Sequence, residues 1–184
     1  MKSRFGPILL IFMLGGCAVA DRPPYLPFHQ AKEYRLGAGD RIRVVVFDQP
    51  NLTATYLVDA SGSVSVPLAG RFKAEGKTSA QVESSIKTAL RDQNLVDDPK
   101  VSVEIASYRP FSILGEVRTP GRYPYDPSMT IEEAVALAGG YTLHADQEEV
   151  RVTTHANGEQ VTDIRPPTAT FYAGDTLYIQ ERWF

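Results

Sequence analysis

Residues 34–184 carry two kinds of hydrophobic pattern, one that repeats at every second residue and one with helical spacing. Short runs of the first kind, rich in β-branched residues and separated by turn signals, predict strands. We expect these strands at residues 41–48, 54–58, 64–68, 70–74, 101–106, 111–117, 122–125, 150–154, 160–164 and 176–180. With two helices between them, they predict an α+β fold of two small β-rich units, each with one helix.

Both predicted helices begin after a threonine, Thr78 or Thr130, that is followed three residues later by Gln or Glu, the spacing of a capping box. The apolar face of the first helix is made of Val82, Ile86, Ala89 and Leu90. The second helix has a shorter apolar face and is expected to end at Gly139-Gly140, because glycine readily adopts the positive φ of a helix stop.

The tripeptide Ala-Gly-Asp occurs at residues 38–40 and again at 173–175, each time just before a predicted strand. We interpret both copies as tight turns in which Gly has a positive φ and Asp accepts hydrogen bonds from nearby backbone N–H groups. A ligand-binding loop is the alternative. Asn157-Gly158 predicts a hairpin turn further along the chain.

The N-terminus has the pattern of a secretory leader, with Lys2 and Arg4 before an apolar run at residues 5–14. This run is about half the length that a membrane-spanning helix needs. Leu14-Gly15-Gly16-Cys17 resembles the bacterial lipoprotein signature, which implies lipidation of Cys17. The alternative is a small buried Cys in an ordinary signal peptide. Ala18 occupies the position where Asp would resemble an inner-membrane retention signal, so we expect the outer membrane.

Composition narrows the function classes further. The 184-residue chain has a formal net charge of −3, and loss of Lys2 and Arg4 with the leader would bring it to about −5, which disfavours a nucleic-acid partner. Cys17 is the single cysteine, which excludes a disulfide framework. The three histidines show no metal-ligand spacing, so we expect neither a metal nor a cofactor.

Candidate catalytic groups are few. Acidic pairs occur at residues 97–98, 132–133 and 148–149, but neighbours in sequence point to different sides of a strand or helix, so their adjacency is no sign of the two carboxylates that flank a glycosidase cleft. Gly-x-Ser-x-Gly, phosphate-loop and Gly-x-Gly-x-x-Gly motifs are all missing from the sequence. We therefore expect no enzymatic activity.

Two further groups of residues have side chains that could contact a ligand. Aromatic residues that could stack on sugars are Tyr108, Tyr123, Tyr125 and Tyr141, although packing in the core is the commoner role of such residues. Arg118 and Arg122 flank the Thr119-Pro120-Gly121 turn and could bind an anionic polymer, although solvated charges are the usual occupants of a turn.

Several segments, in order along the chain, resemble a known family. Those similar to the polysaccharide biosynthesis/export domain are residues 34–42 (YRLGAGDRI), 59–64 (DASGSV), 66–70 (VPLAG) and 99–103 (PKVSV). Those similar to a soluble-ligand-binding β-grasp (SLBB) repeat are residues 111–117, 119–123 (TPGRY), 130–131 and 138–140 (AGG). The resemblance covers residues 34–154 and the final strand.

This resemblance implies an outer-membrane polysaccharide export lipoprotein at the periplasmic face, assembled as a homo-oligomer. The implied cargo is capsular or extracellular polysaccharide, and the implied partner is an inner-membrane copolymerase or chain-length regulator. The corresponding organisation is a signal peptide (1–16), a lipidated Cys17 with a Pro-rich tether (17–33), an export domain (34–107) and an SLBB-like domain with the closing strand (108–184).

The sequence departs from the family pattern after the last strand, where the best-known members continue into an amphipathic helix that crosses the outer membrane. We expect a short form without that helix. A lipid-anchored periplasmic scaffold that recruits synthesis or copolymerase partners therefore stays open as an alternative function.

Overall fold

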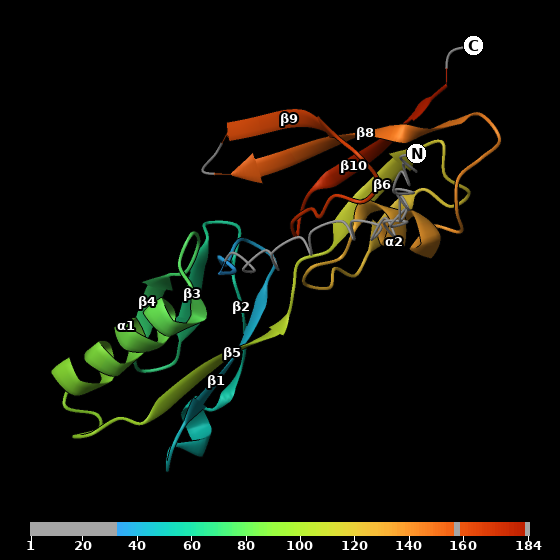
Figure 1. The fold of residues 1–184 in the computed structure, drawn as a ribbon. Helices are drawn as coiled ribbons and strands as arrows, with labels where there is room; N and C mark the ends of the chain where they lie inside the picture. The colour runs from blue at the N-terminus through green and yellow to red at the C-terminus, as the bar shows by residue number, and fades with distance from the viewer. Residues whose placement is uncertain (1–32, 157–158, 183–184) are drawn as a thin grey trace, which may run out of the picture. The chain divides into compact units, whose positions relative to one another are not determined.

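Alternating burial along strand β1 (Arg41–Val46) defines the first sheet, because Ile42, Val44 and Val46 point into a core while Arg41 and Arg43 are exposed. The computed structural model describes residues 33–156 and 159–182 (Figure 1). β1 is the central strand of a three-stranded antiparallel sheet of order β2–β1–β5, with β2 (Ala54–Leu57) and β5 (Val101–Ser107) at its edges. The 3-10 helix η1 (Pro50–Leu52) connects β1 to β2.

Helix α1 (Ser79–Asp92) covers the core of this first sheet. Thr78 makes the expected capping box, since its hydroxyl accepts from the Gln81 amide and the Gln81 side chain accepts from the Thr78 amide. The buried stripe of α1 consists of Val82, Ile86 and Leu90. The hairpin of β3 (Ser63–Val66) and β4 (Gly70–Lys73) packs against the same core and contributes Val64 and Val66.

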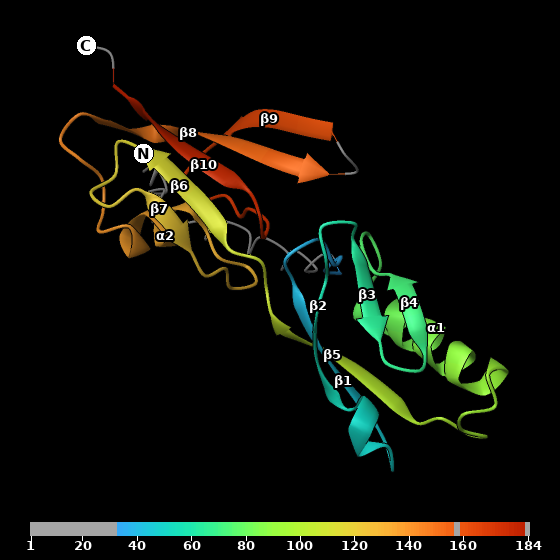
Figure 2. The same cartoon turned by 180° about the vertical axis from the view of Figure 1, so that it is seen from behind.

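The second sheet has five strands in the order β7–β6–β10–β8–β9 and is mixed (Figure 2). Its strands are β6 (Phe111–Gly115), β7 (Gly121–Tyr123), β8 (Ala145–Ala156), β9 (Glu159–Arg165) and β10 (Thr176–Glu181). β10, the last strand in the chain, lies between β6 and β8, parallel to the first and antiparallel to the second. The sheet is therefore completed only when the end of the chain is in place.

Helix α2 (Ile131–Leu137) packs its buried residues Ile131, Ala134 and Val135 into the second core. Thr130 and Glu133 form its capping box, as the sequence predicts. The helix ends where Gly139 and Gly140 take φ values of 83° and 92°, which is the expected glycine stop.

The predicted α+β class is confirmed, and the differences lie in the strand ends. Six strands, β1 to β4, β6 and β7, end one or two residues earlier than the hydrophobic pattern suggests. In β1, β3 and β6 the cause is a positive φ at Asp48, Leu68 or Gly115, after or at the last paired residue. β8 is longer than predicted, because charged and polar residues before Val150 continue its pairing. The predicted Asn157-Gly158 turn lies outside the described residues, while the strands on its two sides pair antiparallel.

Gly115 marks the closest approach between β6 and β10. Its φ is 85°, and a Cβ added there would lie 2.0 Å from the backbone oxygen of Ile179. Gly140 has a similar φ of 92°, but a Cβ there would meet no atom within 4 Å. The two glycines therefore share the backbone strain of a substitution and differ only in the steric contact.

We predict that Gly115→Ala lowers the free energy of unfolding by about 2–4 kcal/mol, whereas Gly140→Ala lowers it by about 1 kcal/mol. Both variants pay for the left-handed backbone, but only the first must also push the Ile179 carbonyl away from its place in the parallel pairing. Urea unfolding of the two variants measures this. Equal losses would show that β6 and β10 separate without cost.

Candidate functional site

A buried carboxylate lies where the first sheet meets the segment that leads into the second. Asp40, at the end of the first Ala-Gly-Asp turn, is 0% exposed. Its Oδ1 accepts from the Arg109 backbone N–H (2.7 Å), and its Oδ2 accepts from Arg109 Nη1 (3.0 Å) and from the Gly37 amide (2.8 Å). The Tyr34 hydroxyl lies 2.9 and 2.8 Å from the two oxygens. The carboxylate is thus fully supplied with donors.

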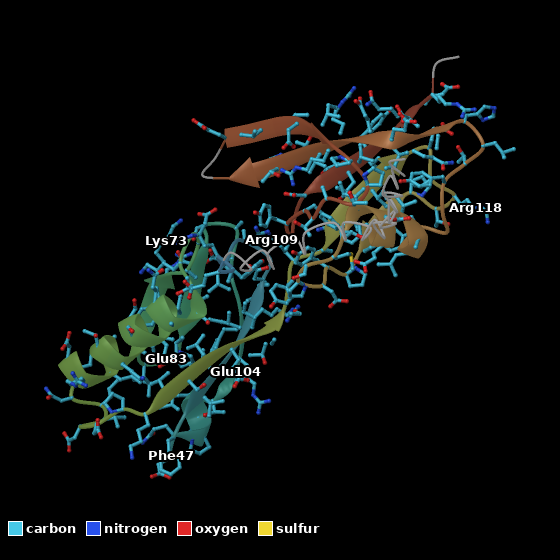
Figure 3. All side chains as sticks on the ribbon, in the orientation of Figure 1. Phe47, Lys73, Glu83, Glu104, Arg109 and Arg118 are labelled. Carbon is cyan, nitrogen blue, oxygen red and sulfur yellow. The ribbon has the colours of Figure 1, made fainter. Side chains whose placement is uncertain are left out.

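Arg109, which is labelled in Figure 3, also lies close to Gly174 of the second Ala-Gly-Asp turn. A Cβ added at Gly37 would lie 2.2 Å from Arg109 Nη1, and one at Gly174 would lie 2.6 Å from Arg109 Nε. A side chain at either position would displace the Arg109 guanidinium, and Gly174 also has a φ of 85°, which favours glycine. A single arginine therefore lies between the turns that lead into β1 and β10.

Burial sets the protonation of two groups near this arginine. Desolvation raises the pKa of the Tyr34 phenol well above its usual range, despite the opposing effect of Arg109, so Tyr34 remains a proton donor to Asp40. Desolvation also raises the pKa of the Asp175 carboxyl, although Asp175 accepts a hydrogen bond from the Tyr172 amide at 2.9 Å. The predicted Asp-to-backbone bonds are thus present in both turns, and both support the turn interpretation.

The loop at residues 59–64 is shaped by one exposed carboxylate. Asp59 Oδ1 accepts from the amides of Ser61 (2.8 Å) and Ser63 (3.0 Å), and Asp59 Oδ2 pairs with Arg71. The Ser61 hydroxyl is the main cause that holds the pKa of the Asp59 carboxyl well below its usual range, with further donors from Ser63 and Arg71. This motif has a structural role in orienting β3.

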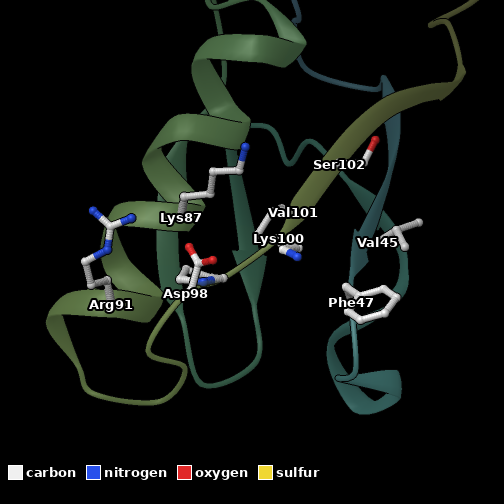
Figure 4. Close-up of a pocket in the computed structure, with 9 residues that line it drawn as sticks. Val45, Phe47, Lys87, Arg91, Asp98, Lys100, Val101 and Ser102 are labelled. Atoms are coloured by element: carbon white, nitrogen blue, oxygen red, sulfur yellow. The ribbon is translucent and has the colours of Figure 1, made fainter.

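A groove runs over the edge of β5, between the end of β1 and the exposed side of α1 (Figure 4). Its volume is about 590 Å³. The residues that line it are Val45, Phe47, Lys87, Arg91, Asp98, Pro99, Lys100, Val101 and Ser102. Phe47 is 64% exposed, and Lys100 Nζ lies 6.0 Å from the centre of its ring. The groove thus combines cations with an exposed aromatic face.

The face of the second sheet opposite its core carries an exposed strip across four strands. Its members are Leu114 on β6, Tyr178 on β10, Arg151 on β8 and Ile164 on β9, which are direct neighbours in the strand register. The Arg151 guanidinium lies 5.4 Å from the centre of the Tyr178 ring. We refer to these four residues as the apolar strip.

The tyrosines singled out in the sequence pack within the second core. Tyr125 is buried and its hydroxyl donates to the Phe171 carbonyl oxygen at 3.1 Å, while Tyr108 makes edge contacts with Tyr34 and Tyr125. Tyr123 stacks on Phe111. Tyr141 is half-buried against the same core. The packing role is therefore the one the structure supports for this group.

The acidic pairs lie in the first turn of α2, in the loop before β5 and within β8. Glu133 caps α2, Glu132 is exposed beside it, and the pairs at 97–98 and 148–149 are exposed. Within residues 33–156 and 159–182, no group of three His, Cys, Asp or Glu side chains is arranged to hold a metal ion. Arg118 and Arg122 lie exposed at their turn.

Cys17 and His29 lie outside the described residues. In the part of the chain that the structure does describe, no helix combines the length and the hydrophobicity needed to cross a membrane.

Comparison with protein families assigns each of the two sheets to a known domain. Residues 29–106 match the polysaccharide biosynthesis/export protein family, and residues 110–164 match the SLBB domain. The chain belongs to the polysaccharide biosynthesis/export family. Within this family protein, the first sheet and α1 fall in the export region, and most of the second sheet falls in the SLBB domain.

Three curated relatives match this family member. The exopolysaccharide production protein ExoF of Rhizobium meliloti (strain 1021) is 39% identical over 148 residues, which are 73% of this chain and 35% of that protein. The EPS I polysaccharide export outer membrane protein EpsA of Ralstonia nicotianae is 30% identical over 199 residues (89% and 51%). The protein of the same name from Ralstonia solanacearum is 34% identical over 151 residues (67% and 40%). The chain thus spans about a third to a half of the relatives' length.

Sequence reasoning missed the role of Arg109 and the groove beside Phe47. Arg109 lies 69 residues from Asp40 and has no local pattern that would indicate a buried partner. The groove draws its residues from three separate segments, at positions 45–47, 87–91 and 98–102. An exposed Phe directly after a β-branched strand was the one available signal.

We predict that Arg109→Gln lowers the free energy of unfolding by about 2–4 kcal/mol, because it leaves the buried Asp40 carboxylate without its cation. Arg118→Gln removes the same charge from an exposed turn and should cost less than about 0.5 kcal/mol. Denaturant unfolding of both variants, of Asp40→Asn alone, and of Arg109→Gln combined with Asp40→Asn checks this. Additive losses in the double variant would contradict a direct ion pair.

Asp175 and Asp59 should give opposite pH dependences of stability. The raised pKa of Asp175 favours folding below its unfolded pKa of about 3.9, and that contribution is lost as pH rises through the folded pKa. The lowered pKa of Asp59 contributes above the same unfolded value and is lost as pH falls. Relative to the wild type, Asp175→Asn should therefore gain stability with rising pH and Asp59→Asn should lose it. Urea midpoints between about pH 2 and pH 7 test the two slopes, which must differ in sign.

Proposed function

We propose that this chain is a non-enzymatic, lipid-anchored component of polysaccharide export at the outer membrane. The observation that carries the proposal is the pair of family matches, an export region followed directly by an SLBB domain. The names of the relatives support the cargo class and the location, since two are called polysaccharide export outer membrane proteins and one an exopolysaccharide production protein. The protein would act by binding and assembly, without covalent chemistry.

The proposed organisation follows the sequence. Residues 1–16 would be removed as a signal peptide, Cys17 would carry the lipid, and the Pro-rich segment up to residue 33 would tether the folded part. Acyl chains contribute roughly 0.8 kcal/mol per buried CH₂ group, so several chains make a durable anchor. The export domain would extend over 34–107 and the SLBB-like domain over 108–184.

The proposed partners are a second copy of the chain and an inner-membrane copolymerase or chain-length regulator. The apolar strip supports assembly into a homo-oligomer, because it exposes Leu114, Tyr178 and Ile164 on one flat face that contact with another copy would bury. Arg151 in the middle of the strip would give such a contact a polar, directional element.

We predict that deletion of the gene abolishes surface polysaccharide while intracellular repeat units persist, and that Cys17→Ala fails to restore export. The physical reason is the loss of the acyl anchor, which leaves the folded part free in the periplasm. Surface and periplasmic polysaccharide are measured in the deletion strain complemented with each form.

Ala18→Asp serves as the matched control, because it keeps the lipid and alters the residue that we associate with sorting between the two membranes. It should leave the protein lipidated and shift it to the inner-membrane fraction. Unchanged surface polymer in the deletion strain would contradict the export function. The alternative function, a periplasmic scaffold for synthesis enzymes, would then be tested by measuring the total amount of polymer made. Full rescue by Cys17→Ala would contradict only the lipid anchor and would leave the export function standing.

A further inference from the structure

The groove over the edge of β5 gathers three cations and one carboxylate. Lys87 and Arg91 extend from consecutive turns of α1, while Lys100 and Asp98 flank Pro99 just before β5 (Figure 4). The lining is therefore positive, although the chain as a whole has a net charge of −3. A cationic hollow on an acidic protein concentrates anions locally.

The three cations differ in whether their charged groups already have a partner within the protein. Lys87 pairs with Glu83 at 2.6 Å, and Glu83 also accepts a hydrogen bond from the Val103 amide at 3.3 Å, so this pair fastens α1 to β5. Within the described residues, the side chains of Arg91 and Lys100 make neither an ion pair nor a hydrogen bond. Their donors are available to a ligand.

Phe47 supplies the apolar side of the groove. Its amide donates to the Lys100 carbonyl oxygen at 2.9 Å, which holds the ring next to that lysine at the end of the β1–β5 pairing. Most of the ring is exposed to solvent, where a large apolar side chain gains nothing for the folded state. The face of an aromatic ring can cover the C–H face of a sugar ring.

We propose that this groove binds an acidic segment of the exported polymer, with carboxylate groups of the saccharide at Arg91 and Lys100 and a sugar ring on Phe47. This inference rests on the proposed export function and names the class of cargo as acidic. Asp98 and Ser102 provide oxygens that can accept hydrogen bonds from sugar hydroxyls. The volume of about 590 Å³ lies within the range of about 300–1,000 Å³ that is typical of small-molecule sites.

The number of cations favours a saccharide over a membrane surface. Basic segments that bind anionic lipids gather about four to eight Lys and Arg residues, whereas this groove has three cations, one of which, Lys87, is paired with Glu83. The Asp98 carboxylate lowers the net charge of the groove further, and its oxygens suit a polymer that carries hydroxyl groups between its carboxylates.

The test is isothermal titration of the purified full chain, at low ionic strength, with galacturonic acid oligomers and with neutral galactose oligomers of the same length. We expect the acidic oligomers to bind more tightly and to weaken with added salt. Arg91→Gln combined with Lys100→Gln should weaken their binding roughly tenfold, because two charge-assisted contacts are lost. Phe47→Ser should weaken the acidic and neutral oligomers to a similar extent.

Arg182→Gln is the matched control, since it removes one exposed cation outside the groove. It should leave binding unchanged, and thermal unfolding of each variant verifies that it folds. Three outcomes would overturn the proposal: equal affinity for both oligomers, an equal loss in Arg182→Gln, or no saccharide binding together with groove-dependent binding to phosphatidylglycerol vesicles. The groove variants could bind both oligomers as tightly as the wild type does and also restore export in the deletion strain. In that case the groove assignment fails while the export function stands.

Discussion

The buried carboxylate of Asp40 is the constraint on which the connection between the two sheets depends. A carboxylate removed from water must be matched by donors, and here they come from Tyr34, from the Gly37 amide and from both the backbone and the side chain of Arg109. Meeting this need fixes the chain between β5 and β6. Because the same arginine crosses Gly174, it also shapes the turn that leads into β10, the strand inserted between β6 and β8.

The groove beside Phe47 results from the way α1 packs against the first sheet. α1 buries Val82, Ile86 and Leu90, and the residues that directly follow the last two, Lys87 and Arg91, therefore project from the edge of that buried stripe towards β5. β1 ends where Asp48 takes a positive φ, which leaves Phe47 as the last residue bonded to β5. The cations and the ring come together because the core requires those elements to be adjacent.

Most of the features that could be predicted from the sequence depend on interactions between residues close together in the chain. Capping boxes at Thr78 and Thr130, the glycine stop at Gly139 and the alternation of β1 depend on neighbours within a few residues, so they can be found without a structure. The strand ends were harder to predict, because Leu68 adopts a left-handed backbone that its side chain disfavours, and Asp48, although Asp tolerates this region, stands in a sequence with no other stop signal. The Asp40–Arg109 pair and the groove join distant segments, and a single sequence contains no signal for such pairs.

The sign of the net charge is a poor guide to what this protein binds. A formal charge of −3 disfavours a nucleic-acid partner, yet the fold collects Arg91, Lys100 and the paired Lys87 at one edge strand. Coulomb interactions at this range are screened over roughly 8–10 Å, so a ligand in the groove responds to those side chains and little to acidic groups elsewhere. A local excess of cations therefore gives an anionic polymer one place where these side chains act on it together, whatever the net charge of the whole chain.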